Sequence, residues 1–279
     1  MSLLVLARRG GAVTAPPAEP GTEPFYNAGA DTLLLGGRDG SFDTYANTTA
    51  LRSAWTTRGT SATLITPGAS GSGNACRFTI PVGAGEVDYG LELYFGGATA
   101  ASLVVQFDFR MSAGADFTSG RYDQSGTKWV LLFRDYNGGI LPRCTLGVQS
   151  LQGGVLAGPA DNGVQFEFRD QSVTPPGSIL QNASKAIGWN TTNEQGTTNR
   201  ATAINDGNWH RYTTLATPTT DTARIWVDGV LTNTSSGVTY PMDNNPFDGC
   251  AIAGPIVPDM LSGYAMTMDI DNLSVFGVG

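Results

Sequence analysis

Residues 103–110 read LVVQFDFR, and residues 164–169 read VQFEFR. Apolar and polar side chains alternate in both stretches, which places Phe107 and Phe109 on one face of an extended strand and the polar residues on the other. A helix would instead repeat its apolar residues every three or four positions. The alternation therefore predicts two half-buried β-strands, each with a core face and a polar face.

Short runs of this kind recur from about residue 41 onward, and glycine, asparagine, aspartate and proline interrupt them about every ten residues, as in a β-sandwich or jelly roll. Asp228-Gly229 predicts a tight hairpin between two of these runs. Ala46–Trp55, with Asn47 or Thr48 as its N-cap, is the best candidate for a helix. The long polar stretches 170–208 and 233–262 are expected to be loops. We expect strands at Leu103–Arg110, Lys128–Asp135, Thr145–Gln149, Val164–Arg169, Trp209–Leu215, Ala223–Val227 and Ala265–Phe276.

The beginning of the chain differs from the rest. Residues 1–40 hold Pro16, Pro17, Pro20 and Pro24 together with several glycines, a composition typical of an extended segment without a core of its own. The sequence thus predicts an all-β protein in two parts. An extended N-terminal arm covers residues 1–40, and a two-sheet antiparallel jelly-roll sandwich covers residues 41–279.

Charge and hydropathy exclude several partners. The chain has 24 acidic and 16 basic residues and a formal charge of −8, whereas nucleic-acid binding needs a basic stripe. Its 41% hydrophobic residues are enough for a core. No apolar run reaches the roughly 18–20 residues of a membrane helix. We expect neither a nucleic acid nor a membrane as partner.

The first ten residues, MSLLVLARRG, do not make a signal peptide, because the apolar run is too short and its arginines follow it. Synthesis in a cytoplasm without an export signal is the expectation. The three cysteines, Cys76, Cys144 and Cys250, fit this compartment as small buried hydrophobic residues, since so few do not form a disulfide framework.

The polar faces of the two opening strands are candidate carbohydrate-binding surfaces. Arg110 lies on one of them, and Gln165, Glu167 and Arg169 lie on the other. Tyr136 and Trp189, in Gly-rich and polar surroundings, could stack on a sugar ring. Ordinary solvated faces are the alternative, with acids and arginines paired across the strands if both strands share one sheet.

Catalytic patterns are weak, so no catalytic residue is assigned. None of the carboxylate pairs Glu86/Asp88, Asp269/Asp271 and Asp108/Glu167 has the pattern of a glycosidase strand. His210 is the single histidine, and as a strand residue it is expected to make a structural hydrogen bond. Asp269 and Asp271, next to Asn272, could offer oxygen ligands to a structural calcium ion; no other cofactor is expected.

Two segments carry a resemblance to a known family. Residues 207–211 (GNWHR) followed by residues 223–230 (ARIWVDGV) resemble the Trp-His…Tyr-Val-Asp-Gly hairpin of laminin-G-like domains, which share the concanavalin A-like lectin and glucanase fold. Residues 268–275 (MDIDNLSV) resemble the last strand of such modules, and residues 102–130 resemble polysaccharide-lyase-type jelly rolls. The resemblance covers residues 41–279 and implies a fold that hosts lectins, hydrolases, lyases and inert structural modules.

A jelly roll of extracellular type without an export signal suggests a phage virion protein, made in the host cytoplasm and displayed on the particle surface. The leading hypothesis is a non-enzymatic decoration subunit of a phage head or tail with a lectin-like domain. A polysaccharide lyase or glycoside hydrolase is the first alternative, and a free-standing carbohydrate-binding module is the second. Expected partners are other virion subunits or copies of itself, with a cell-surface or environmental glycan as a further candidate. Assembly would use the apolar start of the arm and its basic pair, namely Leu3, Leu4, Val5, Leu6, Arg8 and Arg9.

Overall fold

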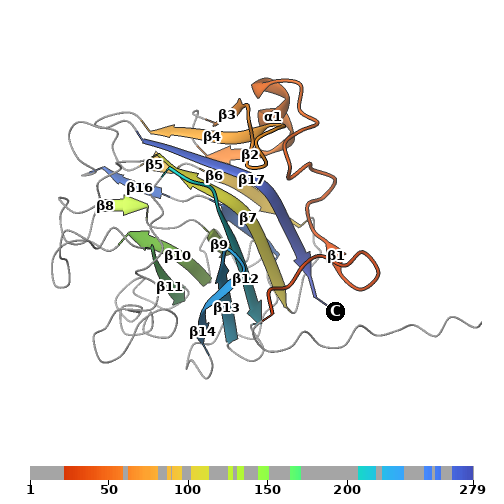
Figure 1. Ribbon diagram of the computed structural model, residues 1–279, viewed down its shortest axis with the longest axis vertical. Coiled ribbons are helices and arrows are strands. Elements are labelled where there is room, and N and C mark those ends of the chain that lie inside the picture. Colours follow the sequence, from red (N-terminus) through yellow and green to blue (C-terminus); the bar gives the residue numbers. More distant parts are fainter. Residues whose placement is uncertain are drawn as a thin grey trace, which may run out of the picture.

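The computed structural model shows a sandwich of antiparallel β-sheets with one short helix (Figure 1). It describes residues 22–58, 62–80, 87–88, 90–95, 102–112, 125–127, 131–134, 144–150, 164–170, 207–217, 222–235, 248–252, 255–258 and 266–278. No helix within these ranges is long and apolar enough to cross a membrane.

The larger sheet has eight strands. Seven of them follow the order β14-β13-β12-β7-β17-β4-β3, and the eighth, β1, pairs with the end of β17. Its strands are β1 (Thr32–Leu33), β3 (Ala62–Ile65), β4 (Ala75–Ile80), β7 (Leu103–Met111), β12 (His210–Thr217), β13 (Thr222–Val227), β14 (Val230–Ser235) and β17 (Met266–Gly277). β17 holds this sheet together, because β7 follows one of its edges while β4 and β1 share the other (Figure 1).

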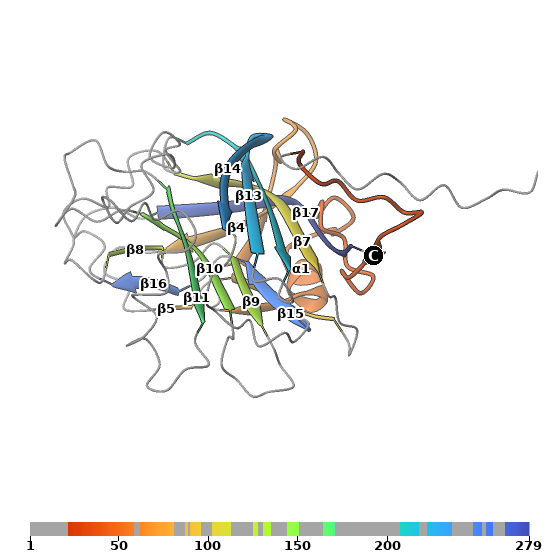
Figure 2. The same cartoon turned by 90° about the horizontal axis from the view of Figure 1, so that it is seen from below.

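The second sheet has six strands in the order β11-β10-β9-β15-β6-β2. They are β2 (Thr56–Arg58), β6 (Gly90–Tyr94), β9 (Leu131–Arg134), β10 (Cys144–Ser150), β11 (Val164–Asp170) and β15 (Gly249–Ile252). Figure 2 separates the layers, with β7, β13 and β17 on one side and β9, β11 and β15 on the other. A small third sheet joins β5 (Val87–Asp88), β16 (Pro255–Pro258) and β8 (Ser125–Thr127). The predicted two-sheet jelly-roll sandwich is thus confirmed, with this third sheet as an addition.

The alternation in β7 produces the core as the sequence predicted. Phe107 and Phe109 are buried, and both rings pack on Tyr212 of β12 with centroids 5.8 and 6.1 Å away. Met268 and Ile270 of β17 are also fully buried. The residues between these, which point to the other side of the sheet, form the polar outer face that carries the site described below.

Local signals also gave the expected elements. Asp228 and Gly229 join β13 to β14 with φ values of 51° and 80°, as a two-residue hairpin turn with left-handed central residues requires. Helix α1 (Thr48–Ala54) begins after Asn47, whose Oδ1 accepts the Ala50 N–H at 2.9 Å. Cys76 and Cys250 are buried, as expected.

The sequence was wrong about the stretch 233–262. We expected a loop there, but β14 extends into it, and β15 and β16 both lie within it. β15 is a central strand between β9 and β6. Its residues are small and apolar throughout (GCAI), so no alternation marked them.

Residues 22–40, which we call the strap, lie along the outer face of the larger sheet. Leu34 and Leu35 are buried, and β1 pairs with the end of β17. Glu23 is only 8% exposed, and its carboxylate accepts hydrogen bonds from Gln106 at 3.0 Å, from Arg211 at 3.1 Å and from the Thr213 hydroxyl. The strap is therefore packed on the domain. The division of the chain at residue 40 stays a prediction, and residues 1–21 lie outside the described residues.

Gly40, at the end of the strap, lies directly against the backbone of β17. Its carbonyl accepts the Leu273 N–H at 2.8 Å, and a methyl group at Gly40 would overlap the Leu273 carbonyl oxygen. We expect Gly40→Ala to lower the free energy of unfolding by about 1–3 kcal/mol, because backbone must move to relieve the overlap. Gly29→Ala is the control, since its added methyl meets nothing closer than 3.4 Å. Urea denaturation checks both variants, and equal stabilities would show that the strap is not docked on β17.

Candidate functional site: a charged row on the outer face

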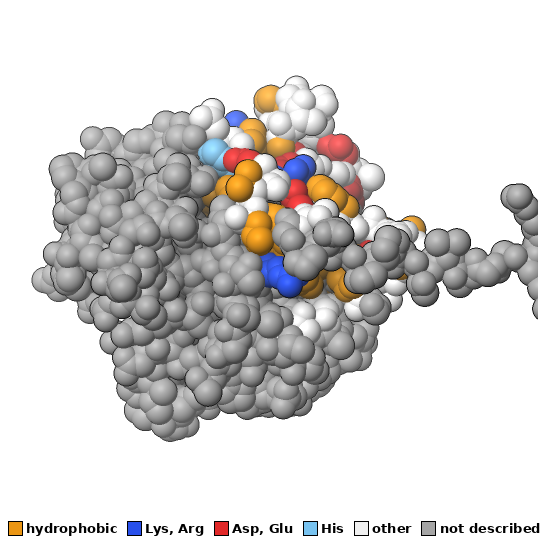
Figure 3. Space-filling view, turned by 60° about the horizontal axis from the view of Figure 1, so that its bottom comes forward, with side chains coloured by type: hydrophobic (Ala, Val, Ile, Leu, Met, Phe, Trp, Pro, Cys, Tyr) orange, Lys and Arg blue, Asp and Glu red, His pale blue; other side chains and the backbone are white. Residues whose placement is uncertain are grey.

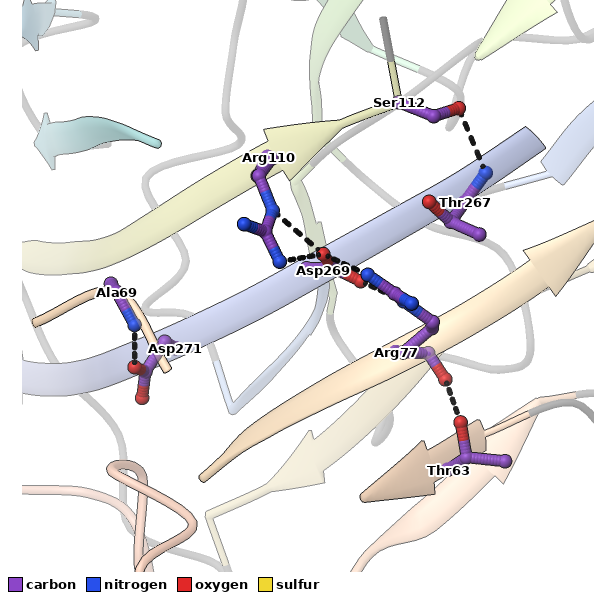
Figure 4. A network of polar contacts seen from close by, with 8 residues as sticks. All are labelled: Thr63, Ala69, Arg77, Arg110, Ser112, Thr267, Asp269 and Asp271. Atoms are coloured by element: carbon purple, nitrogen blue, oxygen red, sulfur yellow. Dashed lines mark hydrogen bonds and ion pairs between the residues drawn. The ribbon is translucent and has the colours of Figure 1, made fainter. Parts of the chain in front are cut away.

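A row of charged and aromatic residues crosses the outer face of the larger sheet. Asp269 of β17 lies directly opposite Arg77 of β4 on one side and Arg110 of β7 on the other. Trp209, which immediately precedes β12, follows in the same row. We call Arg77, Asp269, Arg110 and Trp209 the outer row. The three charged members are drawn in Figure 4, where both arginines point at the carboxylate from flanking strands.

Two guanidinium groups share the Asp269 carboxylate. Arg77 donates from Nε to Oδ1 at 2.6 Å and from Nη2 to Oδ2 at 2.8 Å, while Arg110 donates from Nε to Oδ2 at 2.8 Å. The Asp269 side chain is 1% exposed, whereas those of Arg77 and Arg110 are 32% and 26% exposed. Hydrogen bonding to Asp269 raises the pKa of Arg77. The row thus buries its negative charge and presents guanidinium groups to solvent.

Trp209 completes the row on the side of β12. The guanidinium carbon of Arg110 lies 4.5 Å from the centroid of the indole ring, a cation–π distance. Trp209 is partly exposed. Arg110 is consequently held on two sides, by the carboxylate and by the indole.

A second row, two residues further along the strands, is rich in acids. Asp271 of β17 lies opposite Asp108 of β7, which in turn lies opposite Arg211 of β12. Asn272, with a left-handed φ of 48° at the bulge in β17, donates to Asp108 Oδ2 at 2.7 Å. Burial raises the pKa of Asp108, and burial raises the pKa of Asp271 to about 6 with help from the charges of Asp108 and Asp43.

Arg110 is the one predicted sugar-binding residue whose side chain the structure describes, and it lies in the outer row. Pairing of acids and arginines between the two polar faces would require both strands to share one sheet. They do not, because β7 and β11 belong to different sheets. Arg110 and Asp108 therefore find partners on β17 instead. The structure describes only the backbone of β11, so the side chains of Gln165, Glu167 and Arg169 lie outside it, as do Tyr136 and Trp189.

Asp269 is not the free oxygen ligand that the sequence suggested, because arginines occupy both of its carboxylate oxygens. Asp271 accepts the Ala69 N–H at 2.7 Å and the Asn272 N–H at 2.7 Å. Within the described ranges no three His, Cys, Asp or Glu side chains gather in a way that could hold a metal ion. A calcium ion at Asp269 and Asp271 stays a prediction, and the arginine contacts of Asp269 weigh against it.

His210 makes the kind of contact that its strand position suggested. Its Nδ1 lies 2.8 Å from Asp228 Oδ2, and the other oxygen of Asp228 accepts the Arg211 N–H at 2.9 Å. Asp228 is the first residue of the hairpin turn. The contact thus joins the start of β12 to the β13–β14 turn, as a structural hydrogen bond does.

Sequence reasoning missed Arg77 and Trp209. Arg77 lies in ACRFTI, where alternation puts it between buried Cys76 and Phe78 and so on the polar face. Trp209 entered the sequence analysis only as part of the GNWHR segment and of a predicted strand. Only the register of β4, β17 and β7 reveals that these residues share a row, since Arg77 and Asp269 are 192 positions apart.

Comparison with solved structures shows the same architecture. A mutant of the alginate lyase Aly36B in complex with an alginate tetrasaccharide superposes with a TM-score of 0.51 at 11% identity, covering 85% of this chain and 95% of the lyase. The cellulose-induced protein Cip1 gives 0.48 at 13% identity, covering 81% of this chain and 94% of Cip1. The endo-β-1,4-glucuronan lyase of Trichoderma reesei gives 0.47 at 15% identity, covering 92% and 96%.

No protein-family model matches the sequence. No curated protein matches it either. The likeness to the alginate lyase, at 11% identity, concerns the fold alone. It agrees with the predicted two-sheet jelly-roll sandwich.

Removing the charge of Asp269 should destabilise the sheet, because it leaves two partly buried arginines facing each other. We expect Asp269→Asn to lower the free energy of unfolding by about 2–4 kcal/mol, somewhat below the cost of breaking a fully buried pair. The triple variant Arg77→Met, Asp269→Leu, Arg110→Met should lose less free energy of unfolding than Asp269→Asn alone, because no unpaired charge remains in it. Chemical denaturation of the three proteins would contradict this account if Asp269→Asn were as stable as the parent.

Asp271 should make stability depend on pH. Its pKa of about 6 in the fold exceeds the ordinary value of 3.8, so the folded state binds the proton more tightly. The stabilisation is complete below about pH 4 and is lost as the pH rises through 6. In Asp271→Asn the side chain at this position cannot titrate. As the pH rises from 4 to 7, the free energy of unfolding of Asp271→Asn should therefore increase by about 1–2 kcal/mol relative to that of the parent. Melting curves of the two proteins across this pH range check the prediction. A difference in stability that stays the same from pH 4 to 7 would contradict a raised pKa for Asp271.

Proposed function

We propose that this protein binds carbohydrate at the outer row, and that its preferred ligands are glycans bearing carboxylate groups. The observation that carries the proposal is the arrangement of Arg77 and Arg110 around a buried carboxylate beside the partly exposed Trp209. A sugar ring offers an apolar C–H face and a polar rim. An indole suits the first, and planar guanidinium groups suit the second.

The two arginines are preorganised for such a ligand. Asp269 already fixes the direction of both guanidinium groups, and Trp209 supports one of them from the side. A ligand therefore avoids much of the ordering cost of these side chains, which is about 0.5–1.5 kcal/mol for each long side chain immobilised. An ordinary exposed ion pair would not give this advantage, because its side chains are mobile before binding.

Charge favours acidic glycans over neutral ones at this row. Two arginines against one aspartate leave a single positive charge in excess, and guanidinium groups bind carboxylates with two parallel hydrogen bonds. The protein as a whole carries −8. At physiological ionic strength charges are screened beyond about 8 Å, so acids that lie farther than this from the row act little on a bound carboxylate.

The fold is compatible with this proposal but does not establish it. The alginate lyase that shares the architecture was solved with an alginate tetrasaccharide. The alternative of a lyase or hydrolase gains nothing from the contact of His210 with Asp228, which joins it to the hairpin turn. A place on a phage particle stays a prediction, since the residues expected to mediate assembly, Leu3 to Arg9, lie outside the described part of the chain.

Calorimetric titration with polyuronate oligosaccharides, and with a neutral dextran for comparison, tests the proposal. We expect the parent to bind the polyuronate more tightly, and Trp209→Ala and Arg110→Ala each to raise the Kd at least tenfold. Arg110→Lys should fall between, because it keeps the charge and loses the planar pair of donors. Phe25→Ala is the matched control, since Phe25 also packs on an arginine, but on Arg211 of the second row instead of on a member of the outer row.

Unchanged binding by Trp209→Ala and Arg110→Ala, with melting temperatures showing that both are folded, would remove the outer row as the site. Two assays on the same mixtures test for catalysis: ultraviolet absorbance detects the unsaturated products of a lyase, and a reducing-end assay detects the products of a hydrolase. We expect neither signal. Product formation that disappears in His210→Ala would replace this proposal with a lyase.

A further inference from the structure

Exposed apolar side chains gather where the strap meets the end of β17. Phe25, Tyr26, Leu33 and Val278 are 55%, 40%, 46% and 38% exposed, and they are four of the six large hydrophobic residues that are exposed in the described part of the chain. We call these four the strap patch. Figure 3 shows a face of the molecule on which hydrophobic, acidic and basic side chains lie side by side.

Phe276 joins three members of the strap patch. The ring of Tyr26 meets that of Phe276 edge-on with centroids 5.6 Å apart, and Leu33 lies directly opposite Phe276 in the β1–β17 pair. Val278 comes two residues after Phe276, on the same side of the extended chain. Phe25 adjoins Tyr26. Three members of the patch thus lie around the buried ring of Phe276, and Phe25 lies beside them over Arg211. Soluble proteins rarely leave such groups together in water, so the strap patch suits a partner.

The neighbouring strand edge offers backbone groups as well. Among the described strands β1 pairs with β17 alone, so its other edge has no strand beside it. Asp31 lies immediately before β1 and carries a negative charge next to this edge; its Oδ2 accepts the Asn27 N–H at 2.8 Å. An extended apolar segment followed by basic residues would match all three features: the apolar patch, the edge and the acid.

The chain itself contains such a segment. Leu3, Leu4, Val5 and Leu6 are consecutive apolar residues, and Arg8 and Arg9 follow them. We propose that residues 3–6 of one copy dock on the strap patch and β1 edge of a second copy, with Arg8 and Arg9 meeting Asp31.

The sequence between the two favours exchange between copies over docking within one chain. Residues 10–21 include Pro16, Pro17 and Pro20, and prolines favour extended backbone at about 3.1 Å per residue. If all twelve residues were extended in this way they would span about 37 Å, more than the diameter of a small domain. If each copy docks its residues 3–6 on the other, the result is a two-fold symmetric dimer in which every contact occurs twice.

Light scattering after size exclusion, over a range of concentrations, tests the interface. We expect the intact chain to form a dimer. Deletion of residues 2–9, or the double change Tyr26→Ser and Leu33→Ser, should raise its dissociation constant at least tenfold while the fold persists. The matched control is Tyr94→Ser with Val230→Ser, which removes the two exposed hydrophobic residues outside the patch and should leave the dimer intact. A monomeric parent, or a dimer that survives the deletion, overturns the proposal.

Cross-linking identifies the two surfaces. Val5→Cys and Leu33→Cys are made in separate preparations of a Cys144→Ser background, in which the remaining Cys76 and Cys250 are buried, and then mixed under oxidising conditions. A disulfide between the two preparations supports docking between copies. When both changes are made in one chain, a disulfide that forms within the monomer at high dilution overturns exchange. These results do not depend on glycan binding, because no member of the outer row is changed.

Discussion

The buried carboxylate of Asp269 is the constraint on which the outer face depends. A charge that is 1% exposed is costly unless it is paired, and here it is paired from both sides at once. Both arginines come from strands hydrogen-bonded to β17, so the three strands must keep one register for the carboxylate to be satisfied. A shift of β4 or β7 by a single residue would turn its arginine toward the core. Arg110 is thereby positioned against Trp209, and the proposed binding surface follows from the pairing of one acid.

β17 links this row to the other surfaces of the molecule. Its first half pairs with β4 and its end pairs with β1, and the bulge at Asn272 lies between the two. The strap crosses at this bulge, where the Gly40 carbonyl accepts the Leu273 N–H. Glu23 then ties the start of the strap to β7 and β12. The outer face therefore carries a charged row toward the start of β17 and an apolar patch at its end, two surfaces that suit different partners.

Much of the fold was predictable because its signals are local. The alternation around Phe107 and Phe109, the Asp228-Gly229 turn and the Asn47 cap each follow from a few neighbouring residues. What failed depends on distant pairing. The motifs of β7 and β11 are nearly the same, yet nothing within six residues specifies which sheet a strand joins. Asp269 resembled a metal ligand until the register placed Arg77 and Arg110 beside it. β15 was missed because a central strand of small apolar residues shows no alternation.

The central claim is that a glycan contacts the outer row, and NMR of side-chain N–H groups tests it most directly. The chain has five tryptophans, each with one indole signal, and the arginine Nε–H signals report on the row itself. During titration with a polyuronate oligosaccharide, we predict saturable shifts of the Trp209 indole and the Arg110 and Arg77 Nε–H signals, while those of buried Trp55 and Trp226 stay in place. Saturable binding that moves other signals and leaves Trp209 and Arg110 unchanged would contradict the account.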